Sequence, residues 1–164
     1  RRSSDLGRFR FTPTNPSRWG AVYAMRLDNS TRYKVGTTRT LSAKRKAGIR
    51  SDIKRLTGHA PELHQVFAID INYARKVEAL ALKRLARWRA PIGTMGEFFD
   101  FPSMSEDEAA YLIQAAILSA AAEVRQDAMS RGRWTDAMER SARSVRIVGR
   151  RLVREPIFAA DPQR

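Results

Sequence analysis

The stretch GAVYAMRLDNSTRYKVGTT, residues 20–38, decides the fold. Two alternating runs, AVYAMRL and RYKVGT, lie on either side of an Asp-Asn-Ser sequence at residues 28–30. Alternation with a period of two is typical of half-buried strands, and Asp, Asn and Ser favour tight turns. The stretch therefore predicts an antiparallel β-hairpin.

Helix and strand patterns alternate after the hairpin. Thr40 or Ser42 can cap a cationic helix, and LHQVFAIDI, residues 63–71, alternates as a third strand. A helix with a buried stripe is expected from about 73 to 89. EFFDFP, residues 97–102, reads as a short extended piece that its proline ends.

The C-terminal third has helical patterns. Ser105 precedes three carboxylates, which suit a helix N-terminus, and the predicted helix continues to about Met129. Thr135 can cap a second helix through Val153, whose apolar stripe is Met138, Ala142, Val145, Val148 and Leu152. These two helices predict an αα-hairpin.

These patterns together predict an α+β protein. We expect a three-stranded antiparallel sheet flanked by helices, extended by a C-terminal helical hairpin. The expected organisation is a basic N-terminal arm at 1–18, a domain at 19–104, the helical hairpin at 105–154 and a tail at 155–164.

Positive charge is concentrated in the first two thirds of the chain. The 31 Lys and Arg exceed the 17 Asp and Glu and give a net charge of +14. Residues 1–104 carry 21 cations and 8 anions, a net +13, whereas residues 105–164 carry 10 and 9, a net +1. This imbalance favours a polyanion such as DNA or RNA as the partner of the first part. We expect the C-terminal helices to pack over that part, or to bind a second copy or another protein.

The composition also excludes several classes of site. The chain has no cysteine, which excludes disulfides and cysteine-based zinc sites and is compatible with a reducing, intracellular (cytoplasmic) location. The apolar run AAYLIQAAILSAAA at 109–122 is too short to span a membrane and contains Gln114. No membrane partner is therefore expected.

Several motifs occur in an order that resembles the GIY-YIG nuclease domain. Gly20 to Tyr23 lies where the GIY element would be, Tyr33 to Gly36 where the YIG element would be, and Arg45 follows nine residues after the glycine. FAIDINYARKVEALALKRL and GEFF further along are similar to the small, phage-associated branch, which often has KIG or KVG as its second motif. The resemblance covers about residues 19–101.

The resemblance implies an endonuclease that hydrolyses phosphodiester bonds in DNA with Mg²⁺ or Mn²⁺. It implies that Tyr23 activates or orients water, that Arg45 binds the scissile phosphate and that Glu78 ligates the metal. Lys34 occupies the place of the usual tyrosine in the second motif. Tyr33 precedes it, so alternation places Tyr33 on the opposite face of the strand. Glu97 of GEFF is a second candidate carboxylate.

The residue types agree with this chemistry. Phosphodiester cleavage needs an activated nucleophile and positive charge where negative charge grows in the transition state. Tyrosine, arginine, lysine and a carboxylate-held cation can supply both. The basic residues expected to hold the nucleic-acid backbone are Arg39, Lys44, Lys46, Arg50, Lys54 and Arg55.

Each of these residues also has an ordinary structural interpretation. Tyrosines suit any half-buried strand, Arg45 is one of several cations on its helix, and Glu78 could pair with a neighbouring cation. Trp19 and Trp88 are expected to pack. The competing hypothesis is therefore a non-catalytic nucleic-acid-binding protein that keeps the GIY-YIG-like fold.

Overall fold

A computed structural model describes residues 15–93 and 96–158. The elements in chain order are β1 (Gly20–Leu27), β2 (Arg32–Thr38), α2 (Ala43–Thr57), β3 (Leu63–Ile71), α3 (Ala74–Arg84), the 3-10 helix η1 (Ala86–Trp88), β4 (Phe98–Asp100), α4 (Glu106–Ser130), α5 (Asp136–Ser141), β5 (Arg143–Val148) and β6 (Arg151–Pro156). Most of the predicted arm, and the end of the predicted tail, lie outside the described residues. No helix in the described ranges is long and apolar enough to cross a membrane.

The strands form one antiparallel sheet with six strands in the order β4-β2-β1-β3-β5-β6. The predicted α+β class and the β1–β2 hairpin are confirmed, and β3 has the predicted bounds. The prediction of three strands is wrong, because β4 pairs with the free edge of β2 and β5 pairs with that of β3. Both additions cover edges that a three-stranded sheet would leave exposed.

The predicted C-terminal helical hairpin is wrong. Thr135 does cap a helix, but α5 ends at Ser141 and the chain continues as the β5–β6 hairpin. The two-residue loop begins at Gly149, whose φ of +64° suits a tight hairpin turn. Val145 fits the expected helical spacing but instead lies buried in the sheet. Its apolar spacing is compatible with either structure, and pairing with β3 favours the strand.

Two helices begin at serines that the sequence marks. Ser42 and Ser105 accept hydrogen bonds from backbone N–H groups in the first turns of α2 and α4, as helix N-caps do. The helix after β3 is shorter than predicted, because α3 ends at Arg84 and the chain continues as η1.

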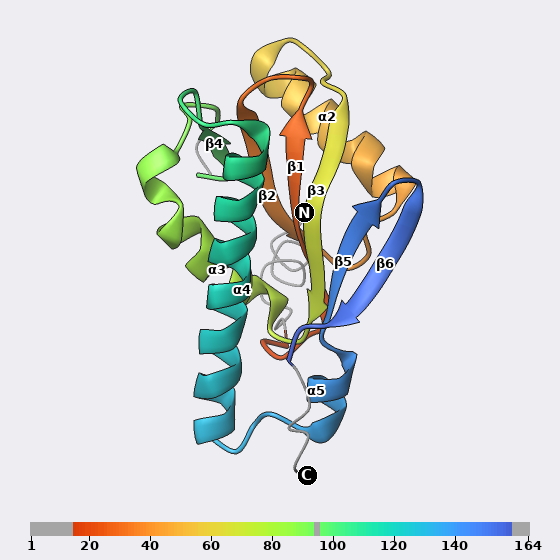
Figure 1. Cartoon of the computed structure of the whole chain (residues 1–164), viewed down its shortest axis with the longest axis vertical. Coiled ribbons are helices and arrows are strands. Elements are labelled where there is room, and N and C mark those ends of the chain that lie inside the picture. The colour runs from red at the N-terminus through yellow and green to blue at the C-terminus, as the bar shows by residue number, and fades with distance from the viewer. Residues whose placement is uncertain (1–14, 94–95, 159–164) are drawn as a thin grey trace, which may run out of the picture.

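Helices cover both faces of the sheet, and α4 and α2 lie on opposite sides of it (Figure 1). One hydrophobic cluster joins the sheet to α3 and α4, and contains Val22, Tyr33, Val35 and Phe99. A smaller cluster joins the other face to α2, through Tyr23, Met25, Ile49, Ile53 and Phe98. The two faces of the β1–β2 hairpin therefore meet different helices.

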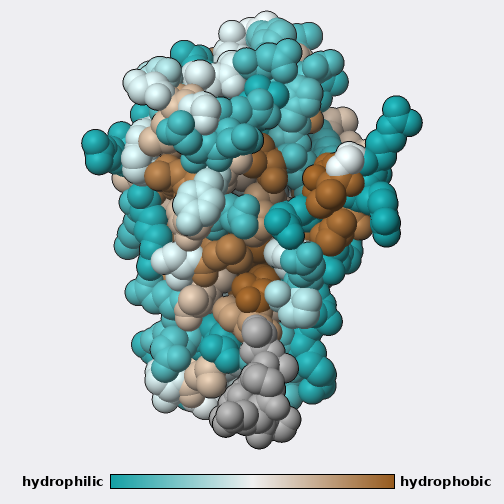
Figure 2. Space-filling view, viewed as in Figure 1, coloured by the Kyte–Doolittle hydropathy of each residue, from teal (hydrophilic) through white to brown (hydrophobic). Residues whose placement is uncertain are grey.

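The β5–β6 hairpin is less covered than the rest of the sheet. Hydrophobic atoms gather over it between hydrophilic ones (Figure 2), and Ile147, Val148 and Leu152 are exposed. Six arginines lie on or near this hairpin: Arg140, Arg143, Arg146, Arg150, Arg151 and Arg154.

Candidate functional site

The pairing of β1 with β2 brings the central motif residues together. Tyr23 lies directly opposite Gly36, and Lys34 is two residues from that glycine on the same side of the sheet. Tyr23 and Lys34 therefore share the face that α2 covers. Tyr33 lies on the other face, where it is buried and its ring meets that of Phe101 edge to face at 5.6 Å.

Lys34 links two other predicted site residues. Its ammonium group donates hydrogen bonds to the Tyr23 hydroxyl oxygen at 3.2 Å and to Glu97 Oε2 at 3.0 Å. The backbone N–H of Val35 donates to the carbonyl oxygen of Glu97 at 2.9 Å, which fixes Glu97 beside β2. The GEFF segment is thus placed by the strand that carries Lys34.

Gly36 makes room for this arrangement. A Cβ atom at position 36 would lie 2.5 Å from the Tyr23 hydroxyl oxygen and 2.8 Å from Lys34 Nζ. Real Cβ atoms do not approach other atoms so closely, so a larger residue would displace the tyrosine and the lysine. The absence of a side chain, rather than an unusual backbone angle, explains the glycine here.

The Lys34 side chain is charged although it is largely buried. Burial alone would lower the pKa of Lys34, but the Tyr23 oxygen and the Glu97 carboxylate outweigh it and raise that pKa above the ordinary value for lysine. Lys34 is 8% exposed and Tyr23 is 0% exposed. The pair therefore forms the floor of the site, with positive charge fixed next to a phenol.

Glu78 approaches the floor from α3, past the open edge of β2. β4 pairs with β2 only as far as Lys34, so the edge near Thr37 stays accessible to α3. Burial, and then the negative charge of Glu97, raise the pKa of Glu78 above its ordinary value. Lys34, Arg75 and the backbone N–H of Thr37 act in the opposite direction. The site thus contains two neighbouring carboxylates.

Arg45 lies at the rim of the site, on the first turn of α2. It precedes the buried Ile49 by four residues, so it lies on the side of the helix that faces the sheet. Arg45 is exposed, and among the described residues it forms no ion pair. Its guanidinium group is therefore free to bind an incoming anion.

One cavity of about 490 Å³ joins these side chains. Its lining includes the predicted residues Tyr23, Lys34, Arg45, Glu78 and Glu97, from β1, β2, α2, α3 and the segment before β4. Arg75 also lines it and was not singled out from the sequence, although its position three residues before Glu78 on a helix is a usable signal. Leu82, four residues after Glu78, does not line the cavity and packs against the hydrophobic cluster of α3 and α4.

The carboxylates of this cavity fit a hard divalent cation. Mg²⁺ is commonly bound by one or two protein carboxylates, with water and substrate phosphates completing its coordination. Glu78 and Glu97 lie close enough for Glu97 to affect the pKa of Glu78, and a cation between them would offset that repulsion. No group of three or more His, Cys, Asp and Glu side chains that could hold a metal occurs in the described part of the chain.

The other predicted backbone-binding cations spread over the outside of α2 and the loop before it. Arg39, Lys44, Arg50, Lys54 and Arg55 are exposed, and Lys46 is half-buried. Arg55 pairs with Asp52, and Arg50 donates to the carbonyl oxygen of Pro61 at 2.7 Å. None of these six residues lines the cavity, so they add positive charge to the surface outside it.

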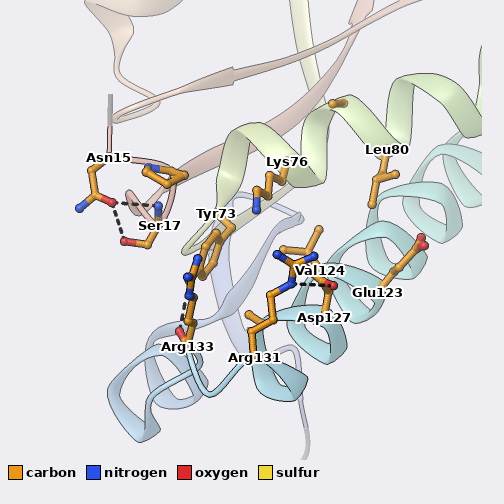
Figure 3. Close-up of a pocket in the computed structure, with 13 residues that line it drawn as sticks. Asn15, Ser17, Tyr73, Lys76, Leu80, Glu123, Val124, Asp127, Arg131 and Arg133 are labelled. Carbon is orange, nitrogen blue, oxygen red and sulfur yellow. Dashed lines mark hydrogen bonds and ion pairs between the residues drawn. The ribbon is translucent and has the colours of Figure 1, made fainter. Parts of the chain in front are cut away.

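A second cavity of about 550 Å³ lies between the N-terminal end of α3 and the C-terminal half of α4 (Figure 3). Two contacts between its lining residues occupy some of its polar groups. The Tyr73 hydroxyl donates to the carbonyl oxygen of Arg133 at 3.2 Å, and Asp127 pairs with Arg131 at 3.4 Å. This cavity is larger than the first but contains none of the candidate site residues that the sequence predicts, so it is the weaker candidate for catalysis.

Comparisons with models of known protein families, with curated proteins and with solved structures found no match for this chain.

Proposed function

We propose that this chain is a GIY-YIG-type endonuclease that hydrolyses phosphodiester bonds in DNA with a divalent metal ion. The observation that carries the proposal is the single cavity lined by Tyr23, Lys34, Arg45, Glu78 and Glu97. These residues come from five separate parts of the chain, and they supply the proton-transfer, cationic and metal-binding groups that the reaction needs.

Arg45 and Lys34 would bind the scissile phosphate. Arg45 is at the rim and unpaired among the described residues, so it would meet the phosphate first, and guanidinium groups bind phosphate oxygens in pairs. Lys34 lies deeper and is charged. Both cations would stabilise the negative charge that grows on the phosphorus centre.

Tyr23 would orient the attacking water and, in its phenolate form, accept the proton that the water loses. The Lys34 ammonium group at 3.2 Å stabilises negative charge on the Tyr23 oxygen. Tyr23 has no exposed surface in this structure, and its hydroxyl oxygen is hydrogen-bonded to Lys34, which also binds Glu97. A phosphate that drew Lys34 away from Glu97 would uncover the phenol and release the Glu97 carboxylate.

Glu78 would be the principal ligand of Mg²⁺ or Mn²⁺, and Glu97, once released, would be the second. A cation held there would neutralise charge on the phosphate oxygens as the bond breaks. The low number of protein ligands leaves coordination positions for the substrate, as is usual for Mg²⁺ in phosphate chemistry.

The test compares cleavage by the wild-type chain and by Glu78→Gln. Labelled single-stranded and duplex DNA would be incubated with Mg²⁺, with Mn²⁺ or with EDTA, and products resolved on denaturing gels. We expect cleavage with metal, none in EDTA, and a loss of about 10²-fold or more in Glu78→Gln, because a removed charge-stabilising group typically costs that much. Glu62→Gln, an exposed glutamate outside the cavity, is the matched control.

Two results would count against the proposal. Equal cleavage by wild type and Glu78→Gln would mean that Glu78 is not the metal ligand. Binding of DNA without cleavage of either substrate, with either metal, would favour the non-catalytic nucleic-acid-binding protein instead.

A further inference from the structure

Trp19 is exposed where the sequence predicts a packed tryptophan. Trp19 immediately precedes β1 and is 41% exposed. It belongs to neither hydrophobic cluster, whereas Trp88 packs against the cluster of α3 and α4. Trp19 therefore presents accessible aromatic surface beside β1 that a ligand can contact.

Two cavities meet at Trp19. One of about 390 Å³ shares Thr37 and Arg75 with the candidate site and continues to Trp19 and Arg39. A smaller one of about 130 Å³ begins at the same Trp19 and Arg39 and reaches Leu152 on β6. Each cavity thus shares lining residues with the next one. Together they form a track that runs from the candidate site past Trp19 to the β5–β6 hairpin.

The section between the candidate site and Trp19 is cationic. Its charged lining residues are Arg18, Arg39, Arg75 and Lys76, all exposed. No acidic side chain lines it among the described residues, and no ion pair there involves any of these four. The first turn of α3, which borders this section, also contains no acid. This concentration of positive charge suits the binding of successive phosphates of a nucleic-acid backbone.

We propose that this track binds an unpaired stretch of the DNA strand adjacent to the cleaved phosphate, with a base stacked on Trp19. The inference rests on the proposed nuclease function for the position of that phosphate. Cations alone would hold a duplex equally well, since its backbone carries the charge. An exposed indole adds a surface that only a base with a free face can use, as in proteins that bind single strands.

The test measures binding in EDTA, so that it needs no catalysis. Fluorescein-labelled DNA would be titrated with wild-type protein, Trp19→Ala and Tyr111→Ala, with fluorescence anisotropy as the readout. The ligands are a single strand, the same sequence as a blunt duplex, and the single strand with abasic residues. Tyr111 is the matched control, because it is an aromatic on α4 with 75% exposure and lines none of the track.

We expect Trp19→Ala to weaken binding of the single strand by about fivefold or more, the lower end of what loss of one base–aromatic stack costs. Binding of the blunt duplex should change by less than about twofold, and the abasic strand should bind wild type and Trp19→Ala alike. Tyr111→Ala should match wild type with every ligand. Unchanged melting temperatures would show that both variants fold.

Two outcomes would overturn the inference: equal losses for single strand and duplex, or no loss for either. The proposed function fails separately. If Trp19→Ala shows the expected pattern but the wild type never cleaves with Mg²⁺, the track stands without the nuclease. If the wild type cleaves and Trp19→Ala binds single strands normally, the nuclease stands without the track.

Discussion

The two faces of the β1–β2 hairpin use the same strands for different purposes. On the α3–α4 face, Tyr33 and Val35 pack into a continuous hydrophobic cluster. On the α2 face, the neighbouring positions Lys34 and Gly36 leave space beside Tyr23 for a polar cavity. A one-residue step along β2 thus changes a side chain from core to candidate site, because successive side chains point to opposite faces.

The largest expected effect separates the two tyrosines. Under the proposed mechanism, Tyr23→Phe should lower kcat by about 10²-fold or more, since it removes a group that transfers a proton. Tyr33→Phe should leave kcat within about twofold, because Tyr33 lies on the other face. Single-turnover cleavage with Mg²⁺ measures both. Equal losses in the two variants would mean that the hydroxyl on the α2 face has no special role.

The sequence predicts the centre of this molecule better than its edges. The β1–β2 hairpin, β3 and the start of α4 follow from alternation and capping residues that act over a few positions. The β5–β6 hairpin does not, because its apolar spacing also fits a helix. Its conformation depends on the free edge of β3, which is far away in the sequence.

The candidate site shows the same limit. Alternation places Tyr33 and Lys34 on opposite faces of β2 and permits Tyr23 and Lys34 to share one, and the register of the hairpin puts them there. It cannot place Glu97, whose contact with Lys34 spans 63 residues of chain, or Arg75, which enters the cavity only because α3 passes the open edge of β2. Those positions depend on how the elements pack rather than on local pattern.

The second-largest expected effect tests whether the missing side chain at Gly36 makes room for Tyr23 and Lys34 on the α2 face. Gly36→Ala should lower the free energy of unfolding by about 1–3 kcal/mol, because the added methyl group overlaps the Tyr23 ring and the Lys34 ammonium. It should also lower kcat by about 10²-fold through displacement of both groups. Urea denaturation and cleavage assays measure the two effects.

Gly48→Ala is the control for Gly36→Ala. Gly48 lies inside α2, and an added Cβ there would meet only Arg45 Nη1 at 3.9 Å, an ordinary contact. The free energy of unfolding of that variant should be about 0.5–1 kcal/mol higher than that of wild type, because alanine loses less backbone entropy than glycine when a helix forms. If both variants were equally stable, the close approach of Tyr23 to Gly36 would not be a constraint on the fold.

The smallest expected effect is the loss of folding stability caused by ionisation of Glu78. Its pKa is raised in the folded chain, chiefly by burial, so the folded state holds the proton more tightly than the unfolded state does. Stability from this group is therefore greatest below its unfolded pKa and falls as pH rises through its folded pKa. Glu78→Gln, which never ionises, should melt at a higher temperature than wild type at neutral pH in EDTA. The difference should shrink as pH falls below the unfolded pKa of glutamate, where both side chains are neutral.

A Glu78→Gln variant that was less stable than wild type at neutral pH would mean that the α2-face cavity stabilises this carboxylate instead of straining it, and that no metal ion is needed to offset its charge.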